Sequence, residues 1–117
     1  MFSLFKSSSK AAPAGDTLAA GTCYERFAEG ATMLDVRTPG EFGKGHLMCA
    51  QNVDVMANDF RQRVEELGLD PSKPVYLYCR SGNRSGQAAK ILRQMGFVEA
   101  FNVGSFDALK AVGFETD

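Results

Sequence analysis

The feature that most constrains this chain is an apolar run that ends in a cysteine and a small, basic loop. Val75 to Tyr78 are apolar or aromatic, Cys79 follows, and RSGNRSG (residues 80–86) comes next. A run this rich in Val and Tyr predicts a buried strand. After the loop, apolar side chains recur at helical spacing until a glycine stop: Ala88, Ile91, Leu92, Met95, then Gly96. The segment therefore predicts a strand, a loop and an amphipathic helix, with a thiol at the end of the strand.

Short apolar strands and helices alternate along the rest of the chain. Strands are predicted at residues 32–36, 52–55, 74–79 and 99–103. Helices are predicted at 22–28 with Thr22 as a cap and Gly30 as the stop, from Pro39, over 58–67, and from Ser105 to 112. This alternation is typical of an α/β fold with a central parallel sheet of about five strands, flanked by helices on both faces. Such sheets bind ligands beyond the carboxyl ends of their strands, which is where Cys79 is placed.

The charge is distributed unevenly, although the net charge of the 117 residues is only −1. Residues 79–98 contain four cations (Arg80, Arg84, Lys90, Arg93) and no carboxylate. A local cationic element on a nearly neutral protein favours a small anionic ligand over a polyanion. We therefore expect no nucleic-acid partner. The sequence also lacks an apolar run of about 20 residues, so we expect no membrane-spanning helix.

The N-terminal residues differ in composition from the rest. Residues 1–15, MFSLFKSSSKAAPAG, are predicted to be a flexible segment before a domain at 16–117, and their apolar start is too short for a signal peptide. The cysteines Cys23, Cys49 and Cys79 are odd in number and widely spaced, which indicates neither a disulfide framework nor, with one histidine, a metal site. These features favour a reducing, cytoplasmic location.

The loop after Cys79 has the composition of an anion-binding site. The first N–H groups of a helix are unpaired and carry partial positive charge, and a glycine-containing loop lets further N–H groups converge. Arg80 and Arg84 add fixed positive charge. Together these groups favour the thiolate, so we expect the pKa of Cys79 to lie below about 8.5 and the sulfur to act as a nucleophile. A purely structural, buried cysteine is the alternative, but RSGNRSG is poor core material.

Two kinds of reaction use a thiolate cradled in this way. Tyrosine-type phosphatases have a Cys-x5-Arg loop, whereas here Ser85 is the sixth residue after Cys79 and the arginine is Arg84. The loop is one residue tighter and supplies no acid for a leaving alkoxide. Transfer of a single sulfur atom needs a smaller cradle and is favoured. A phosphatase- or arsenate-reductase-like enzyme on the same kind of fold, and a non-catalytic binding module, remain as alternatives.

Two motifs in the expected order resemble those of single-domain rhodaneses, which are thiosulfate sulfurtransferase-like proteins. LDVRTPGEFGKGH (residues 34–46) resembles the first signature of that family, and YCRSGNRSGQAA (78–89) resembles its active-site loop. The following helix ILRQMGF and strand FNVGS are also similar. The resemblance covers about residues 16–114 and implies a rhodanese-like fold.

The resemblance also implies a mechanism. Cys79 would attack the outer sulfur of a small anionic donor such as thiosulfate and hold it as a persulfide. A thiol, cyanide or a protein cysteine would then remove the sulfur, with no cofactor. The loop backbone would cradle the sulfur and the two arginines would attract the donor; these substrate-binding residues are Arg80, Ser81, Gly82, Asn83 and Arg84.

The first motif is expected to support the site structurally. The resemblance implies that Asp35 and Arg37 end a strand, with Asp35 pairing with a cation or with backbone N–H groups, and that Glu41 is an ion-pair partner. It also implies that His46 packs behind the site, without a role in proton transfer.

Two segments depart from the family pattern. Met48 and Cys49 stand where Pro-Gly is usual, so Cys49 is either a small filler or a resolving thiol for Cys79. Residues 104–107 contain one glycine and Phe106 where the family often has two glycines and a tryptophan. Since this segment helps to wall the substrate entrance in the family, the departure bears on the acceptor more than on the fold.

Overall fold

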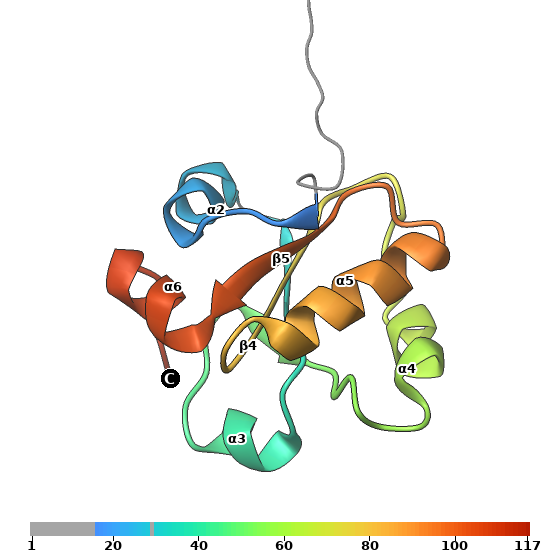
Figure 1. Ribbon diagram of the computed structural model, residues 1–117, viewed down its shortest axis with the longest axis horizontal. Coiled ribbons are helices and arrows are strands. Elements are labelled where there is room, and N and C mark those ends of the chain that lie inside the picture. The colour runs from blue at the N-terminus through green and yellow to red at the C-terminus, as the bar shows by residue number, and fades with distance from the viewer. Residues whose placement is uncertain (1–15, 29) are drawn as a thin grey trace, which may run out of the picture.

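A parallel sheet in the order β3-β2-β4-β5 forms the centre of the protein. The computed structural model describes residues 16–28 and 30–117, so the expected flexible segment 1–15 lies outside the described residues (Figure 1). The strands are β2 (Thr32–Asp35), β3 (Ala50–Asn52), β4 (Val75–Cys79) and β5 (Ala100–Ser105). Every neighbouring pair is parallel, as predicted.

The expected number of about five strands is wrong for the described part of the chain, which has a sheet of four. The position beyond β5 is taken by one isolated parallel bridge between Thr17 and Asn102. The N–H of Leu18 donates to the carbonyl of Asn102 at 3.0 Å, and a helix begins two residues later. The chain turns into that helix before a strand can extend.

Helices cover both faces of the sheet (Figure 1). They are α2 (Ala20–Arg26), α3 (Pro39–Gly43), α4 (Phe60–Glu66), α5 (Asn83–Gln94) and α6 (Phe106–Val112). Side chains of β4 alternate between two cores, because successive strand residues point to opposite faces. Leu77 and Cys79 join the core under α4 and α5, whereas Tyr76 and Tyr78 join the core under α2 and α6.

Two predicted boundaries are wrong. The first helix begins at Ala20 rather than after Thr22, and no side chain caps it; its position is fixed by burial of Cys23 against the sheet. The strand predicted at 52–55 is instead β3 at Ala50–Asn52. Residues Val53 and Val55 still donate to carbonyls at the end of β2 and just beyond it, at 2.9 and 3.2 Å, but as single bonds outside the ladder.

Local signals at two other helices are confirmed. Thr38 and Glu41 form a capping box at α3, with Pro39 in the first turn. The hydroxyl of Ser105 caps α6 by accepting from the N–H of Ala108 at 3.1 Å. Both helices therefore begin where the sequence predicts.

An irregularity in the sheet lies beside the cysteine. Leu77 pairs with Asn102, but Cys79 pairs with Ser105, so β5 contains one more residue than β4 over this interval. Gly104, with φ 93°, lies within the extra stretch, in a conformation that glycine adopts more readily than other residues. The bulge places the start of α6 opposite the end of β4.

Within the described ranges, no helix is long and apolar enough to cross a membrane.

Candidate active site

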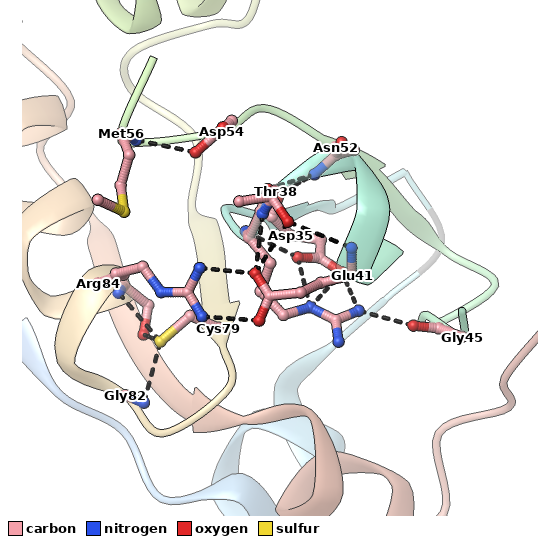
Figure 2. Close-up of polar contacts among 12 residues, drawn as sticks. Asp35, Thr38, Glu41, Gly45, Asn52, Asp54, Met56, Cys79, Gly82 and Arg84 are labelled. Atoms are coloured by element: carbon pink, nitrogen blue, oxygen red, sulfur yellow. Dashed lines mark hydrogen bonds and ion pairs between the residues drawn. The ribbon is translucent and has the colours of Figure 1, made fainter. Parts of the chain in front are cut away.

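Cys79 is the last residue of β4, and its sulfur faces the first turn of α5. The backbone N–H of Gly82 donates to the sulfur at 3.0 Å (Figure 2). The N–H and hydroxyl of Ser85 approach the sulfur at 3.4 and 3.3 Å. Gly82 precedes α5 with φ 96°, a conformation that L side chains rarely adopt. The strand end and the helix start thus converge on one sulfur atom.

The pKa of the Cys79 thiol is lowered despite the burial of the residue. Burial is the largest single influence and raises the pKa, but hydrogen bonds from the Ser85 hydroxyl and from the N–H groups of Ser85, Ser81 and Gly82 together outweigh it. The direction agrees with the sequence-based expectation. The expected N–H groups of the loop and of the first turn of α5 contribute, and the Ser85 hydroxyl adds a donor that the sequence did not predict. The charge of Arg84 also interacts with Cys79.

Arg84 is paired with a carboxylate instead of being open to an anion. Its two terminal nitrogens donate to the carboxylate oxygens of Glu41 at 2.7 and 2.9 Å, and Figure 2 shows the side chain turned toward Glu41. The pair holds the pKa of Glu41 at about 2. This confirms the expected ion-pair role of Glu41. It also joins α3 to the loop-helix unit and largely neutralises the charge of Arg84.

Asp35 and Arg37 form a buried ion pair at the end of β2. The guanidinium of Arg37 donates to both carboxylate oxygens of Asp35 at 2.6 to 3.1 Å, and the backbone N–H of Arg37 donates to the same side chain at 3.0 Å. Arg37 also donates to the carbonyl of Gly45 at 2.7 Å and lies 4.8 Å from the ring centre of Phe106. The pair therefore ties the strand end to the turn after α3 and to α6.

A cleft of about 340 Å³ begins at Arg80, the neighbour of Cys79. Its lining combines three cations, two carboxylates and one aromatic ring: Arg37, Lys44, Arg80, Glu41, Asp107 and Phe106. Since Glu41 is bound to Arg84 and Arg37 to Asp35, Lys44 and Arg80 remain against Asp107, and the remaining charge in the cleft is positive. Phe106 and Asp107 belong to the segment expected to wall the entrance.

Sequence reasoning missed two residues of the site. Ser85 is fully buried and contacts the sulfur, but it was considered only as the position where a phosphatase would have arginine. Asn102 on β5 contacts Ser85, Gly82 and Gly104. A small polar residue in the first turn of the predicted helix could have indicated Ser85, whereas Asn102 is brought to the loop only by strand pairing.

The other candidate residues lie away from the sulfur. The imidazole of His46 stacks on Phe42 with ring centres 3.6 Å apart and donates from Nδ1 to the carbonyl of Phe42 at 2.7 Å. Cys49 is exposed and lines a separate pocket of about 550 Å³ with Phe27 and Phe114, which belong to the core on the opposite face of the sheet from Cys79. The sheet therefore separates Cys49 from the sulfur of Cys79. Within residues 16–28 and 30–117, no cluster of three potential metal ligands occurs.

Comparison with known protein families matches residues 19–111 to the Rhodanese-like domain family. The chain belongs to this family. Among curated relatives of this rhodanese-like chain, the uncharacterized protein YqhL of Bacillus subtilis is 44% identical over 73 residues, which are 62% of this chain and 55% of YqhL. The thiosulfate sulfurtransferase PspE of Escherichia coli is 32% identical over 71 residues, 61% of this chain and 66% of PspE. The match thus spans between half and two thirds of these relatives.

Further relatives and solved structures agree with the family. The thiosulfate sulfurtransferase GlpE of Pseudomonas putida is 32% identical over 87 residues, 74% of this chain and 76% of GlpE. The solution structure of the rhodanese-like domain of Anabaena Alr3790 superposes with a TM-score of 0.73 at 27% identity, covering 87% of this chain and 78% of that one. A rhodanese from E. coli, solved with anions, gives 0.60 at 27% identity over 75% and 98%. The rhodanese-like fold is therefore established.

Proposed function

We propose that this protein is a sulfurtransferase that carries sulfur as a persulfide on Cys79. The observation that supports this most directly is the sulfur of Cys79 at a strand end, accepting hydrogen bonds from Gly82 and Ser85. The thiosulfate sulfurtransferases among the relatives support the same reaction class.

The proposed reaction has two half-reactions at the same sulfur. The Cys79 thiolate attacks the outer sulfur of thiosulfate; a new S–S bond forms, the S–S bond of thiosulfate breaks, and sulfite leaves with the electron pair. A nucleophilic acceptor such as cyanide or a thiol then attacks the outer persulfide sulfur, and Cys79 leaves as a thiolate. No external oxidant or acid is needed, because sulfite is a good leaving group.

The charges of the site assign different roles to the two loop arginines. Arg80 is exposed and lines the cleft, so it is the loop cation available to an anionic donor. Arg84 is held by Glu41 and instead fixes the position of the loop. Because Cys79 is buried, the loop at Ser81 and Gly82 must move before a donor sulfur reaches the thiolate. Asn83, also exposed, opens the helix behind them.

Intact-mass measurement after incubation with thiosulfate tests the proposal. The wild type is expected to gain the mass of one sulfur atom on the peptide that contains Cys79, and cyanide should remove it as thiocyanate. Cys79→Ser should gain no sulfur and lose thiosulfate:cyanide activity, whereas Cys49→Ser, the matched thiol control, should retain both. Sulfur on Cys49 or Cys23 in place of Cys79 would contradict the assignment.

The same preparation distinguishes the alternatives. Turnover of p-nitrophenyl phosphate that is lost in Cys79→Ser would indicate a phosphatase-like enzyme. Failure of Cys79 to take up sulfur from any small donor would leave a binding module. One relative, the putative sulfur carrier protein YrkF of B. subtilis, is 32% identical over 75 residues, which supports including a protein thiol among the acceptors. A cytoplasmic location is part of this proposal, since a reducing compartment keeps the free thiol of Cys79 reduced.

A further inference from the structure

The hydroxyl of Ser85 lies between two acceptors but has one hydrogen to donate. Its oxygen is 2.7 Å from Oδ1 of Asn102 and 3.3 Å from the sulfur of Cys79. A hydroxyl can donate one hydrogen bond and accept through its lone pairs. The hydrogen therefore points either to the amide or to the sulfur, and the shorter contact is the one to Asn102.

The orientation of the Asn102 amide is fixed by two other contacts. Its Nδ2 donates to the carbonyl of Gly82 at 3.0 Å, and its Oδ1 accepts from the N–H of Gly104 at 3.0 Å. A flipped amide would place an oxygen against a carbonyl oxygen and an N–H group against an N–H group. The atom facing Ser85 is thus an acceptor, and it keeps the Gly104 hydrogen bond when Ser85 turns away.

The two protonation states of the cysteine require different hydroxyl orientations. With the thiol, Ser85 donates to Asn102 and its oxygen accepts the S–H hydrogen of Cys79. With the thiolate, the thiol proton has left to solvent, and Ser85 can turn its own hydrogen to the negatively charged sulfur. No group remains unpaired in either state, because Gly104 continues to donate to Asn102.

We propose that Asn102 is a positioning residue of the sulfur site, which holds the Ser85 hydroxyl hydrogen while Cys79 is a thiol and releases it when the sulfur becomes negatively charged. This inference rests on the proposed function only in taking Cys79 as the working nucleophile. The bulge at Gly104 belongs to the device, because it brings the Gly104 N–H to the same amide oxygen. Asn102 thus has two opposite effects on the ionisation of Cys79. It opposes ionisation by holding the hydroxyl hydrogen of Ser85, and it assists ionisation by holding Gly82 in place through the Gly82 carbonyl.

A double-mutant cycle on thiolate formation separates these two effects. The ultraviolet absorbance of the thiolate is titrated in the wild type, Ser85→Ala, Asn102→Ala and the double variant, each with its Cys79→Ser counterpart as the blank. Ser85→Ala should raise the pKa of Cys79 by about one pH unit, the value of one hydrogen bond to a charged group. The tether to Gly82 is lost equally in both backgrounds, so it cancels in the cycle.

The expected result is a coupling of defined sign. Asn102→Ala changes the pKa of Cys79 in both backgrounds. The change should be lower by about half a pH unit with Ser85 present than in the Ser85→Ala background. The physical reason is that the freed hydroxyl then serves only the sulfur. An identical change in both backgrounds would show that Asn102 acts through the fold or the tether alone, and would overturn the proposal.

A second substitution keeps the test open if Asn102→Ala does not fold. Asn102→Asp retains the size of the side chain and offers Ser85 a stronger, charged acceptor, while its loss of the Gly82 hydrogen bond is the same in both backgrounds and cancels. The coupling should therefore reverse: the pKa of Cys79 should rise more with Ser85 present than in Ser85→Ala. An absent or unreversed coupling contradicts the proposal. Because no sulfur donor is present, the titration stands apart from the proposed function; persulfide formation on Cys79 without coupling would reject this inference alone.

Discussion

Single side chains decide how much negative charge the sulfur of Cys79 can carry and which anion approaches it. Neutral donors from Ser85 and Gly82 stabilise the negative charge of the sulfur, while Arg84 is bound to Glu41. Fixed charge is therefore available mainly for attraction through Arg80 and its cleft. Two predictions separate the attraction of an anionic donor by Arg80 from the positioning of the loop by the Glu41–Arg84 pair.

Replacing Arg80 should weaken donor binding more than replacing another cation of α5 or its loop. Arg80→Ala is expected to raise the KM for thiosulfate several-fold, with the larger effect at low ionic strength because salt screens exposed charges beyond about 10 Å. Lys90→Ala removes the same charge from an exposed position outside the cleft and serves as the control. Steady-state kinetics at two salt concentrations measure the KM of both variants. Equal effects of Arg80→Ala and Lys90→Ala on the KM would contradict a specific role of Arg80 in donor binding.

The Glu41–Arg84 pair should stabilise the fold over a defined pH range. The pKa of Glu41 is lowered from 4.5 to about 2, mainly by its hydrogen bond from Arg84, so its contribution is complete above 4.5 and is lost as the pH falls through about 2. Because the pair is partly exposed, Glu41→Gln should reduce the free energy of unfolding at neutral pH by about 1 kcal/mol.

Thermal unfolding at neutral and acidic pH measures this contribution. The difference between wild type and Glu41→Gln should shrink as the pH approaches about 2. Glu25→Gln, an exposed change on α2, is the control and should cause little difference at either pH. A difference for Glu41→Gln that is independent of pH would show that the charge of Glu41 is not its cause.

At the level of elements, the site depends on three segments that lie side by side: the end of β4, the start of α5 and the bulge of β5. The two backbones do not approach too closely for a side chain, since a Cβ on Gly82 would lie 3.6 Å from the Cα of Gly104. The spacing is an ordinary van der Waals contact, so the positive φ of Gly82 is the stronger constraint.

Gly82→Ala should damage both the loop and the thiolate. The left-handed conformation costs a non-glycine residue about 1–2 kcal/mol, and relief of that strain would move the Gly82 N–H away from the sulfur. We expect a lower melting temperature and a higher pKa of Cys79, measured by thermal unfolding and by thiolate titration. Gly21→Ala, inside α2 with no atom within 4 Å of the added Cβ, should not destabilise the protein. An unchanged pKa in Gly82→Ala would show that the other donors suffice.

At the level of the whole molecule, two cores hold the sheet between helix layers, and β4, the strand that ends in Cys79, belongs to both. Cys79 and Leu77 face α5, whereas Tyr78 points into the opposite core and accepts the N–H of Leu47 at 3.0 Å. Burial raises the pKa of Tyr78. The hydroxyl thus connects β4 to the segment between α3 and β3 without touching the sulfur.

Tyr78→Phe should reduce stability without changing the chemistry of the thiol. Removing the hydroxyl leaves the buried N–H of Leu47 unpaired, at a cost of about 1–3 kcal/mol. Denaturant unfolding should show this loss, and Tyr24→Phe, at a residue that is 47% exposed, should not. The pKa of Cys79 is expected to stay unchanged. A raised pKa would mean that the opposite core also positions the active-site loop.

The sequence by itself determined the elements whose signals are local. Residues 74–86 predict a strand, a cysteine and an anion-binding loop because burial, small residues and helix periodicity all lie within one segment, and Thr38 with Glu41 predicts its own helix start. It did not determine the strand number or the first helix start, because a single bridge at Thr17 and the burial of Cys23 depend on packing.

Only the tertiary structure decided which side chains meet the sulfur. Glu41 lies 43 positions from Arg84 in the sequence and Asn102 lies 17 positions from Ser85, and parallel strand pairing brings both pairs together. The composition of the loop could predict a basic site but not that Glu41 would neutralise one of its arginines. Charge and hydrogen bonding act over a few ångströms of space, so their outcome at Cys79 depends on the fold.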